Sequence, residues 1–156
     1  MRATLYLETS VISYLASTPS NNLIIAGNQA TTREWWSKRH AFEMFVSQLV
    51  VNEASAGDPE QAAKRLQLIE GLPILNIADS AEDLARLLLA RVPLPDRASD
   101  DALHIAIAAV NGLEILVTWN CRHIANFAMR PRIEYVLRQA DVEPPTICTP
   151  QELIDV

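Results

Sequence analysis

The sequence predicts a single α/β domain over residues 1–156, built as a three-layer α/β/α sandwich with a mostly parallel sheet of about five strands. Short apolar runs alternate with amphipathic segments along the whole chain, and strands separated by helices are joined by right-handed crossovers that make the sheet parallel. A chain of 156 residues has the length of one domain. Its composition, 49% hydrophobic and 21% charged, is that of a protein with a buried core.

Five short apolar runs are predicted to form the strands. In chain order they are Thr4–Leu7, Phe42–Ser47, Pro73–Ile77, Glu114–Thr118 and Pro145–Cys148. Each is followed by polar residues or by a segment with helical spacing, which is the pattern expected of strands in a parallel sheet.

Caps and apolar spacing predict the helices of the first half. Ser10–Ala16 follows the first strand, and a second helix is expected from Thr31 to Ala41 because Thr32 begins an approximate capping box. Gln48–Ala56 ends at a glycine. Pro59–Glu70 begins with a proline, which suits the first turn of a helix.

The second half contains three more helices and a closing turn. Ser80–Asp83 opens a helix that ends before Pro93. Asp101–Asn111 is apolar on almost every side, as a central helix covered on both sides would be. Arg130–Ala140 is also expected to be helical, and Thr149–Glu152 forms a capping box that ends the chain on a helical turn.

Net charge and cysteine usage exclude several classes of protein. The chain has 13 Lys and Arg against 19 Asp and Glu, a formal charge of -6, which argues against coating nucleic acid by bulk electrostatics. It leaves open an enzyme that handles phosphates at an acidic, metal-filled cleft. Two cysteines are too few for a disulfide scaffold. No apolar run or leader pattern indicates a membrane or secreted protein, so a cytoplasmic protein is expected.

Four polar residues follow strand ends or lie on helices that begin there. They are Glu8, Glu53, Asp101 and Asn120. Ligands in parallel α/β sheets bind beyond the carboxyl ends of the strands, so these residues are expected to converge. Three carboxylates that meet in one cleft repel one another unless they are protonated or bridged by cations. Such oxygen ligands suit Mg²⁺ or Mn²⁺, and the chemistry that follows is metal-assisted hydrolysis of a phosphodiester.

Each of these residues also has a purely structural interpretation. Glu8 suits the positive end of the first helix, and Glu53 suits a buried ion pair with an arginine. Asp101 suits a helix cap and Asn120 a turn. The set favours a site because every acid falls where this topology builds one.

Other motifs for catalysis or cofactor binding are missing or weak. The sequence has no glycine-rich nucleotide-binding motif and no Gly-x-Ser-x-Gly. Cys121 and His123 are too close together to make a convincing zinc pair. A histidine near a turn is more often structural than catalytic, so His104 and His123 are expected at most to support the site.

Taken in order, four segments resemble the motifs of the PIN-domain family. They are Leu7–Val11, Glu53, Asp101–Ala106 and Thr118–Asn120. Within that family the chain looks most like the VapC-type toxins of type II toxin–antitoxin pairs, over essentially its whole length. The resemblance implies an α/β/α sandwich and a Mg²⁺- or Mn²⁺-dependent endoribonuclease. It also implies a homodimer that a co-expressed antitoxin holds inactive.

The resemblance assigns catalytic roles to Glu8, Glu53, Asp101 and Asn120. It implies one ion on Glu8 and Asp101, with Glu53 contributing directly or through water. Residues expected to support the ion or contact RNA are Thr9, Ser10, Asp100, Thr118 and His104. The sequence departs from the family where Glu8 replaces the usual Asp and where Asn120 replaces a frequent Asp. One fewer charge weakens a second metal more than the first.

The implied reaction is attack of a metal-bound water in line with the phosphate, which leaves 5′-phosphate and 3′-hydroxyl ends. An alternative is a PIN-like protein-interaction module whose site has decayed, with Glu8 and Asn120 as the signs of decay. A deoxyribonuclease of the flap-endonuclease type would need DNA-gripping elements that so short and acidic a chain does not offer. The RNA target and the antitoxin stay open.

Overall fold

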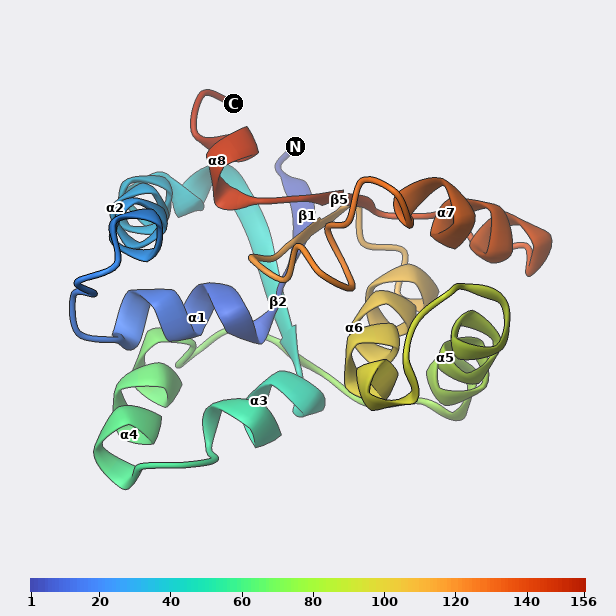
Figure 1. Cartoon of the computed structure of the whole chain (residues 1–156), viewed down its shortest axis with the longest axis horizontal. Coiled ribbons are helices and arrows are strands. Elements are labelled where there is room, and N and C mark those ends of the chain that lie inside the picture. The colour runs from blue at the N-terminus through green and yellow to red at the C-terminus, as the bar shows by residue number, and fades with distance from the viewer.

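A computed structural model describes residues 1–156 and places a five-stranded sheet at the centre of the molecule (Figure 1). The strands are β1 (Ala3–Leu7), β2 (Phe42–Ser47), β3 (Ile74–Leu75), β4 (Ile115–Val117) and β5 (Thr146–Cys148). Their order across the sheet is β3-β2-β1-β4-β5, and every pair is parallel. The prediction of an α/β fold with about five strands is confirmed, and the sheet is wholly parallel.

Eight α-helices and two short 3₁₀ helices connect the strands. They are α1 (Thr9–Ala16), α2 (Leu23–Ser37), η1 (Arg39–Ala41), α3 (Gln48–Ala54), α4 (Pro59–Leu68), α5 (Asp79–Arg91), η2 (Asp96–Ala98), α6 (Ser99–Val110), α7 (Arg130–Gln139) and α8 (Pro150–Leu153). Figure 1 shows α1, α2 and α4 on one side of β1 and β2, and α5, α6 and α7 on the other. The three predicted layers are therefore present. None of these helices combines the length and the apolar character needed to span a bilayer.

The central strand β1 lies between β2 and β4 and is covered on both faces. Its residues Leu5, Tyr6 and Leu7 have no exposed surface, which explains why this strand has no alternation of apolar and polar residues. Leu5 is paired with Met44 on one side and with Ile115 on the other. The end of β1 is therefore fixed at the centre of the sheet.

The second helix differs from the prediction of a helix from Thr31 to Ala41, because it covers Leu23–Ser37. Its N-cap is Asn22, whose side-chain oxygen accepts the amides of the second and third helical residues at 3.0 and 3.1 Å. Thr32 is not a cap. It is buried in the middle of the helix, where its hydroxyl accepts the indole N–H of Trp119 at 2.7 Å.

Other boundaries differ by smaller amounts. The third strand has two residues, Ile74–Leu75, instead of the predicted Pro73–Ile77, and Pro73 contributes only its carbonyl, which accepts from the amide of Val46 at 3.0 Å, because proline has no N–H to donate. The central helix begins at Ser99, so Asp101 lies in its first turn and not at its start. The predicted capping box of Thr149–Glu152 is wrong, because the Thr149 side chain makes no capping bond.

Candidate functional site

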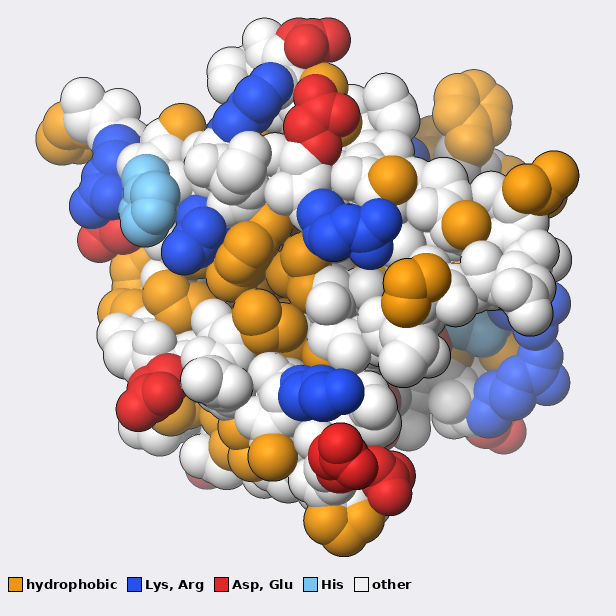
Figure 2. Space-filling view, turned by 90° about the vertical axis from the view of Figure 1, so that its left-hand side faces the viewer, with side chains coloured by type: hydrophobic (Ala, Val, Ile, Leu, Met, Phe, Trp, Pro, Cys, Tyr) orange, Lys and Arg blue, Asp and Glu red, His pale blue; other side chains and the backbone are white.

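The surface has hollows, but none of them contains the polar residues that the sequence singles out. Figure 2 shows the side of the molecule made by α1, α2 and α4, where an apolar hollow is bordered by Lys and Arg side chains. A pocket of about 420 Å³ on this side is lined by Leu15 and Ala16 of α1 and by Lys64 and Leu68 of α4. It lacks carboxylates, so it is not a catalytic site of the predicted kind.

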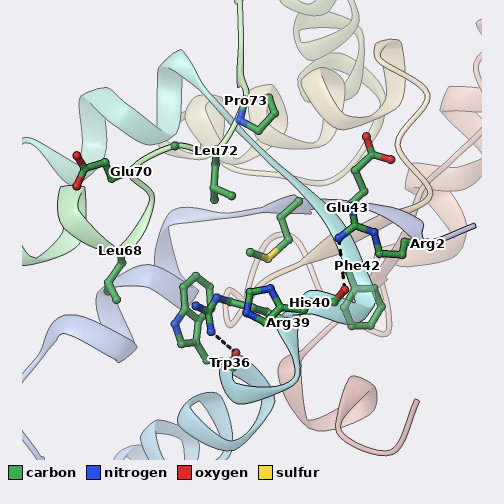
Figure 3. Close-up of a pocket in the computed structure, with 12 residues that line it drawn as sticks. Arg2, Trp36, Arg39, His40, Phe42, Glu43, Leu68, Glu70, Leu72 and Pro73 are labelled. Carbon is green, nitrogen blue, oxygen red and sulfur yellow. Dashed lines mark hydrogen bonds between the residues drawn. The ribbon is translucent and has the colours of Figure 1, made fainter.

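The largest pocket, about 500 Å³, lies at the opposite end of the strands from the predicted site (Figure 3). Its lining includes Arg2, Phe42 and Pro73, which stand at or just before the amino-terminal ends of β1, β2 and β3. The guanidinium of Arg39 lies 4.5 Å from the ring centre of Trp36 and forms part of its wall. Ligands of such sheets bind at the carboxyl ends of the strands, so this pocket lies at the end of the sheet where no catalytic site is expected.

Glu8 is the residue at which β1 ends and α1 begins. Its backbone amide donates to the carbonyl of Val117 at 3.2 Å, which continues the ladder between β1 and β4. Its side chain is the N-cap of α1 and accepts from the amide of Ser10 at 3.2 Å. The hydroxyls of Ser10 and Thr118 also donate to this carboxylate, the latter at 2.5 Å. The buried carboxylate of Glu8 therefore caps α1 and also lies in the candidate site.

Glu53 comes from α3 and meets α1 and α6. Its Oε1 accepts a hydrogen bond from the Thr9 hydroxyl at 2.5 Å and lies 2.7 Å from Nε2 of His104. The alternative of an ion pair with an arginine is not realised, because histidine is its basic partner. Burial alone would raise the pKa of Glu53. The pKa is nevertheless lowered, because the hydrogen bond from His104, the positive charge of His104 and the hydrogen bond from Thr9 together outweigh burial.

His104 lies on α6 with no exposed surface. Burial lowers the pKa of its imidazole, but the bond to Glu53 and the charges of Glu8, Glu53 and Asp101 outweigh burial, so the pKa is raised. Its other ring nitrogen, Nδ1, is 2.7 Å from the hydroxyl of Tyr6.

These side chains form a cluster that could hold a divalent cation. One ligand atom from each of Glu8, Glu53 and His104 lies within 4.8 Å of the other two. Nε2 of His104 is 3.9 Å from Oε2 of Glu8. Two carboxylates in close proximity favour a cation between them, and their oxygens are ligands that Mg²⁺ and Mn²⁺ accept. The two carboxylates therefore fit such an ion.

Asp101 forms a separate group beside this cluster. Its Oδ1 accepts from the side-chain amide of Asn120 at 2.9 Å, and its Oδ2 is 2.8 Å from Nδ1 of His123. The backbone amide of His123 donates to Oδ1 of Asn120 at 3.0 Å, which closes a ring of three residues. Asn120 therefore orients the Asp101 carboxylate and also the chain that carries His123.

Thr118 links the two groups. Its hydroxyl donates to Glu8 and accepts the backbone amide of Asn120 at 2.9 Å. The structure thus brings all four residues predicted to be catalytic to the carboxyl ends of β1 and β4, in two groups joined by one threonine. Among the predicted supporting residues, Thr9, Ser10, Thr118 and His104 contact the carboxylates. Asp100 is exposed, and its side chain makes no hydrogen bond to either group.

Sequence reasoning missed two residues of the network and undervalued a third. The sequence predicts Tyr6 and Ser47 only as strand residues, yet their hydroxyls lie 2.8 Å apart at the site, and both side chains are buried. Burial, despite the bond to Ser47, raises the pKa of the Tyr6 phenol, so it stays protonated. His123, at spacing three from Asn120, was discounted, although this spacing brings neighbouring side chains together in a turn.

Two solved structures share the fold. VapC20 of Mycobacterium tuberculosis, a toxin that cleaves the sarcin–ricin loop, has a TM-score of 0.55 at 15% identity, over 72% of this chain and 86% of its own. VapBC2 of Rickettsia felis, bound to a DNA fragment from its promoter, has a TM-score of 0.53 at 13% identity, over 94% and 98%. At such identities the likeness concerns the fold. No curated protein is similar enough in sequence to be matched.

The family follows from a second comparison. The sequence model of the PIN domain matches residues 5–126, a stretch that includes all four residues predicted to be catalytic. The chain belongs to the PIN domain family. The resemblance inferred from its motifs is therefore confirmed, and its structural neighbours are VapC toxins.

Proposed function

We propose that the protein is a metal-dependent endoribonuclease that acts, through one domain over residues 1–156, as the toxin of a toxin–antitoxin pair. The observation that carries the proposal is the gathering of three carboxylates, those of Glu8, Glu53 and Asp101, with the amide of Asn120 at the carboxyl ends of the central strands of a PIN fold. RNA as the substrate is supported by the loop-cleaving activity of VapC20, which shares the fold.

The proposed ion is Mg²⁺ or Mn²⁺, held by Glu8 and Asp101 with Glu53 as a third ligand or as a ligand through water. When bound, such an ion supplies a water of lowered pKa and neutralises charge on the phosphate. The chain fixes each carboxylate in advance: Glu8 through Ser10 and Thr118, Glu53 through Thr9 and His104. Asp101 is fixed by Asn120 and His123. Rigid ligands of this kind reduce the reorganisation needed in the reaction.

Glu53 is the residue proposed to orient the attacking water. Its side chain keeps 31% of its surface exposed, whereas that of Glu8 keeps 7%. A partly exposed carboxylate can accept a hydrogen bond from water that faces the substrate, whereas protein donors already bond to the oxygens of Glu8. In-line attack then yields 5′-phosphate and 3′-hydroxyl ends, with no covalent intermediate.

The proposed protein partners are a cognate antitoxin and a second copy of the chain. The antitoxin is supported by VapBC2, which has the same fold. A homodimer is supported by Leu23 and Ile24 at the start of α2, which are 88% and 76% exposed. Contiguous exposed apolar surface marks interaction sites between proteins.

Cleavage of RNA tests the proposal. End-labelled structured RNA is incubated with the purified, antitoxin-free protein in Mn²⁺ or Mg²⁺, with EDTA and with the variant Asp101→Asn. We expect metal-dependent cuts that carry 5′-phosphate and disappear in both controls. Asp96→Asn is the matched variant, because Asp96 is exposed and lies outside the site; it is expected to cut like the parent chain. Cuts that persist in EDTA would contradict the proposal.

The alternative is an interaction module that has lost catalysis. It is favoured by one observation: protein donors already satisfy the Glu8 carboxylate, which caps α1 whether or not a metal binds. Calorimetry with Mn²⁺ separates the two functions. A nuclease of the proposed kind binds the ion and loses it in Asp101→Asn, whereas absence of both metal binding and cleavage would favour the interaction module.

A further inference from the structure

A buried chain of hydrogen bonds runs from Ser47, the N-cap of α3, to Glu53 of the same helix through Tyr6 of β1 and His104 of α6. Ser47 lies 2.8 Å from the hydroxyl of Tyr6, which lies 2.7 Å from Nδ1 of His104, whose Nε2 lies 2.7 Å from Oε1 of Glu53. Ser47, Tyr6 and His104 all have no exposed surface. Only the last member of the chain reaches solvent.

In the hydrogen bond between His104 and Glu53, the donor is fixed by the charge of Glu53. The ionised carboxylate has no proton, so Nε2 of His104 must carry one and donate it. When the ring is neutral, Nδ1 accepts from the Tyr6 hydroxyl. When the ring is protonated, Nδ1 donates, and the Tyr6 hydroxyl turns to donate to Ser47 instead. Since hydroxyls serve in either direction, the bond from Nε2 to Glu53 is the same in both states.

Glu53 needs such support more than Glu8 does. It stands on α3, a helix of seven residues, and apart from His104 its carboxylate has only the hydroxyl of Thr9 as a side-chain donor. A long, partly exposed side chain samples several rotamers unless its head group is held. The imidazole comes from the core and cannot move without displacing Tyr6.

We propose that His104, locked in place by Tyr6 and Ser47, is a positioning residue that holds the Glu53 carboxylate toward the metal, and that it is not itself a metal ligand. This inference rests on the proposed function, because it assigns a role at the same site. Partners of ligating carboxylates behave in this way in metal centres, where their loss weakens metal binding about 10–100-fold.

A double-mutant cycle on Mn²⁺ affinity tests the role. His104→Leu removes the bond to Glu53 and leaves Tyr6 paired with Ser47. By calorimetry we expect it to weaken Mn²⁺ binding about 10–100-fold. In a Glu53→Ala background the same change is expected to have almost no further effect, because its target is gone. His40→Leu, at an exposed histidine that lines the pocket at the amino-terminal ends of the strands, is the matched control and is expected to bind Mn²⁺ like the parent chain.

The opposite results overturn the inference. If His104→Leu weakens Mn²⁺ binding equally in the Glu53→Ala background, the imidazole acts on the ion directly. If it has no effect in the parent chain, which still binds Mn²⁺, Glu53 does not need the imidazole. Both results leave the proposed nuclease intact, whereas a parent chain that binds no Mn²⁺ contradicts the proposed function itself.

A spectroscopic measurement needs no metal. In the metal-free protein, ¹⁵N shifts of the His104 ring are expected to show a protonated Nε2, with a proton that exchanges slowly with water. Tyr6→Phe, which keeps the ring and removes one hydroxyl, serves if His104→Leu does not fold; it is expected to lower Mn²⁺ affinity by a smaller factor. A metal-free His104 without a proton on Nε2 would overturn the inference.

Discussion

At the scale of single residues, the site is built by giving each carboxylate its own set of donors. Glu8 is held by hydroxyls and an amide, Glu53 by a hydroxyl and an imidazole, and Asp101 by an amide and an imidazole. The raised pKa of His104 lets this histidine compensate negative charge without a lysine or an arginine in the cluster. A permanent cation there would compete with a metal ion for the same oxygens.

The pair of Glu53 and His104 predicts a pH window for stability in the metal-free protein. Because the pKa of Glu53 in the folded protein is lower than its ordinary value of 4.5, the ionised carboxylate stabilises the fold above pH 4.5. This stabilisation is lost as the pH falls through the pKa of Glu53 in the folded protein. Because the pKa of His104 in the folded protein is higher than its ordinary value of 6.5, the protonated imidazole stabilises the fold below pH 6.5. This stabilisation is lost as the pH rises through the pKa of His104 in the folded protein. Urea unfolding in EDTA is expected to show that the free energy of unfolding of the parent chain exceeds that of His104→Leu by the largest amount between pH 4.5 and pH 6.5. A difference that does not change with pH would contradict this prediction.

Thr118 predicts a second effect on stability. Thr118→Val keeps the shape of the side chain but removes the donor to the buried Glu8 and the acceptor of the Asn120 amide. We expect the free energy of unfolding to fall by about 1.5–3 kcal/mol, the range for a hydrogen bond to a charged group. Thr146→Val, at an exposed threonine of β5, is the control and should stay within about 0.5 kcal/mol of the parent chain. Equal losses in the two variants would contradict the assigned role.

At the scale of secondary-structure elements, the caps decide where the helices begin. Asn22 satisfies two free amides at the start of α2, and Glu8 does the same for one amide of α1. The first cap is purely structural, since Asn22 is exposed and its side chain makes no hydrogen bond to the acidic groups. The second joins the start of a helix to the site.

The cap of α2 gives a prediction at this scale. Asn22→Ala is expected to lower the free energy of unfolding by about 1 kcal/mol, because two amides of the first turn lose their acceptor. The neighbouring Asn21→Ala is the control, since its exposed side chain caps nothing. Thermal unfolding of both variants checks the difference, and an equally large loss in Asn21→Ala would rule out capping as the cause.

The sequence predicted the strands better than the helix boundaries, for physical reasons. A buried parallel strand such as β1 is apolar throughout, which is a local signal. The role of Thr32 depends on Trp119, a partner 87 residues away, so its local resemblance to a cap was misleading. Asn22, the observed cap, lies in the polar stretch Ser20–Asn22, where no local pattern distinguishes a cap from a loop residue.

The candidate site shows the same division. Strand ends and topology indicate where Glu8, Asp101 and Asn120 gather, because backbone geometry fixes those positions. The hydrogen-bond partners of these side chains could not be predicted in the same way. That His123 binds Asp101 and that Tyr6 supports His104 depends on rotamers and on contacts between distant elements, which no spacing rule encodes.

At the scale of the whole molecule, the fold separates the acidic groups from the apolar surface. The carboxylates lie at the carboxyl ends of β1 and β4, whereas the exposed apolar residues Leu23 and Ile24 start α2.

The proposed homodimer is tested by its mass in solution. Light scattering after gel filtration is expected to give twice the mass of one chain for the parent protein and the mass of one chain for Ile24→Asp, because a buried carboxylate in an apolar contact is costly. Ile74→Asp, at an exposed apolar residue on the edge strand β3, is the control and should stay dimeric. A monomeric parent chain at high concentration would contradict the dimer.

The central claim is that these carboxylates hold the ion on which RNA cleavage depends, and the position of that ion tests it without knowledge of the RNA target. Crystals grown with Mn²⁺ and measured at the manganese absorption edge locate the ion directly. We predict one anomalous peak at coordinating distance from Glu8 and Asp101, with Glu53 as a ligand or one water away. A peak elsewhere, or none at saturating Mn²⁺, would contradict the account.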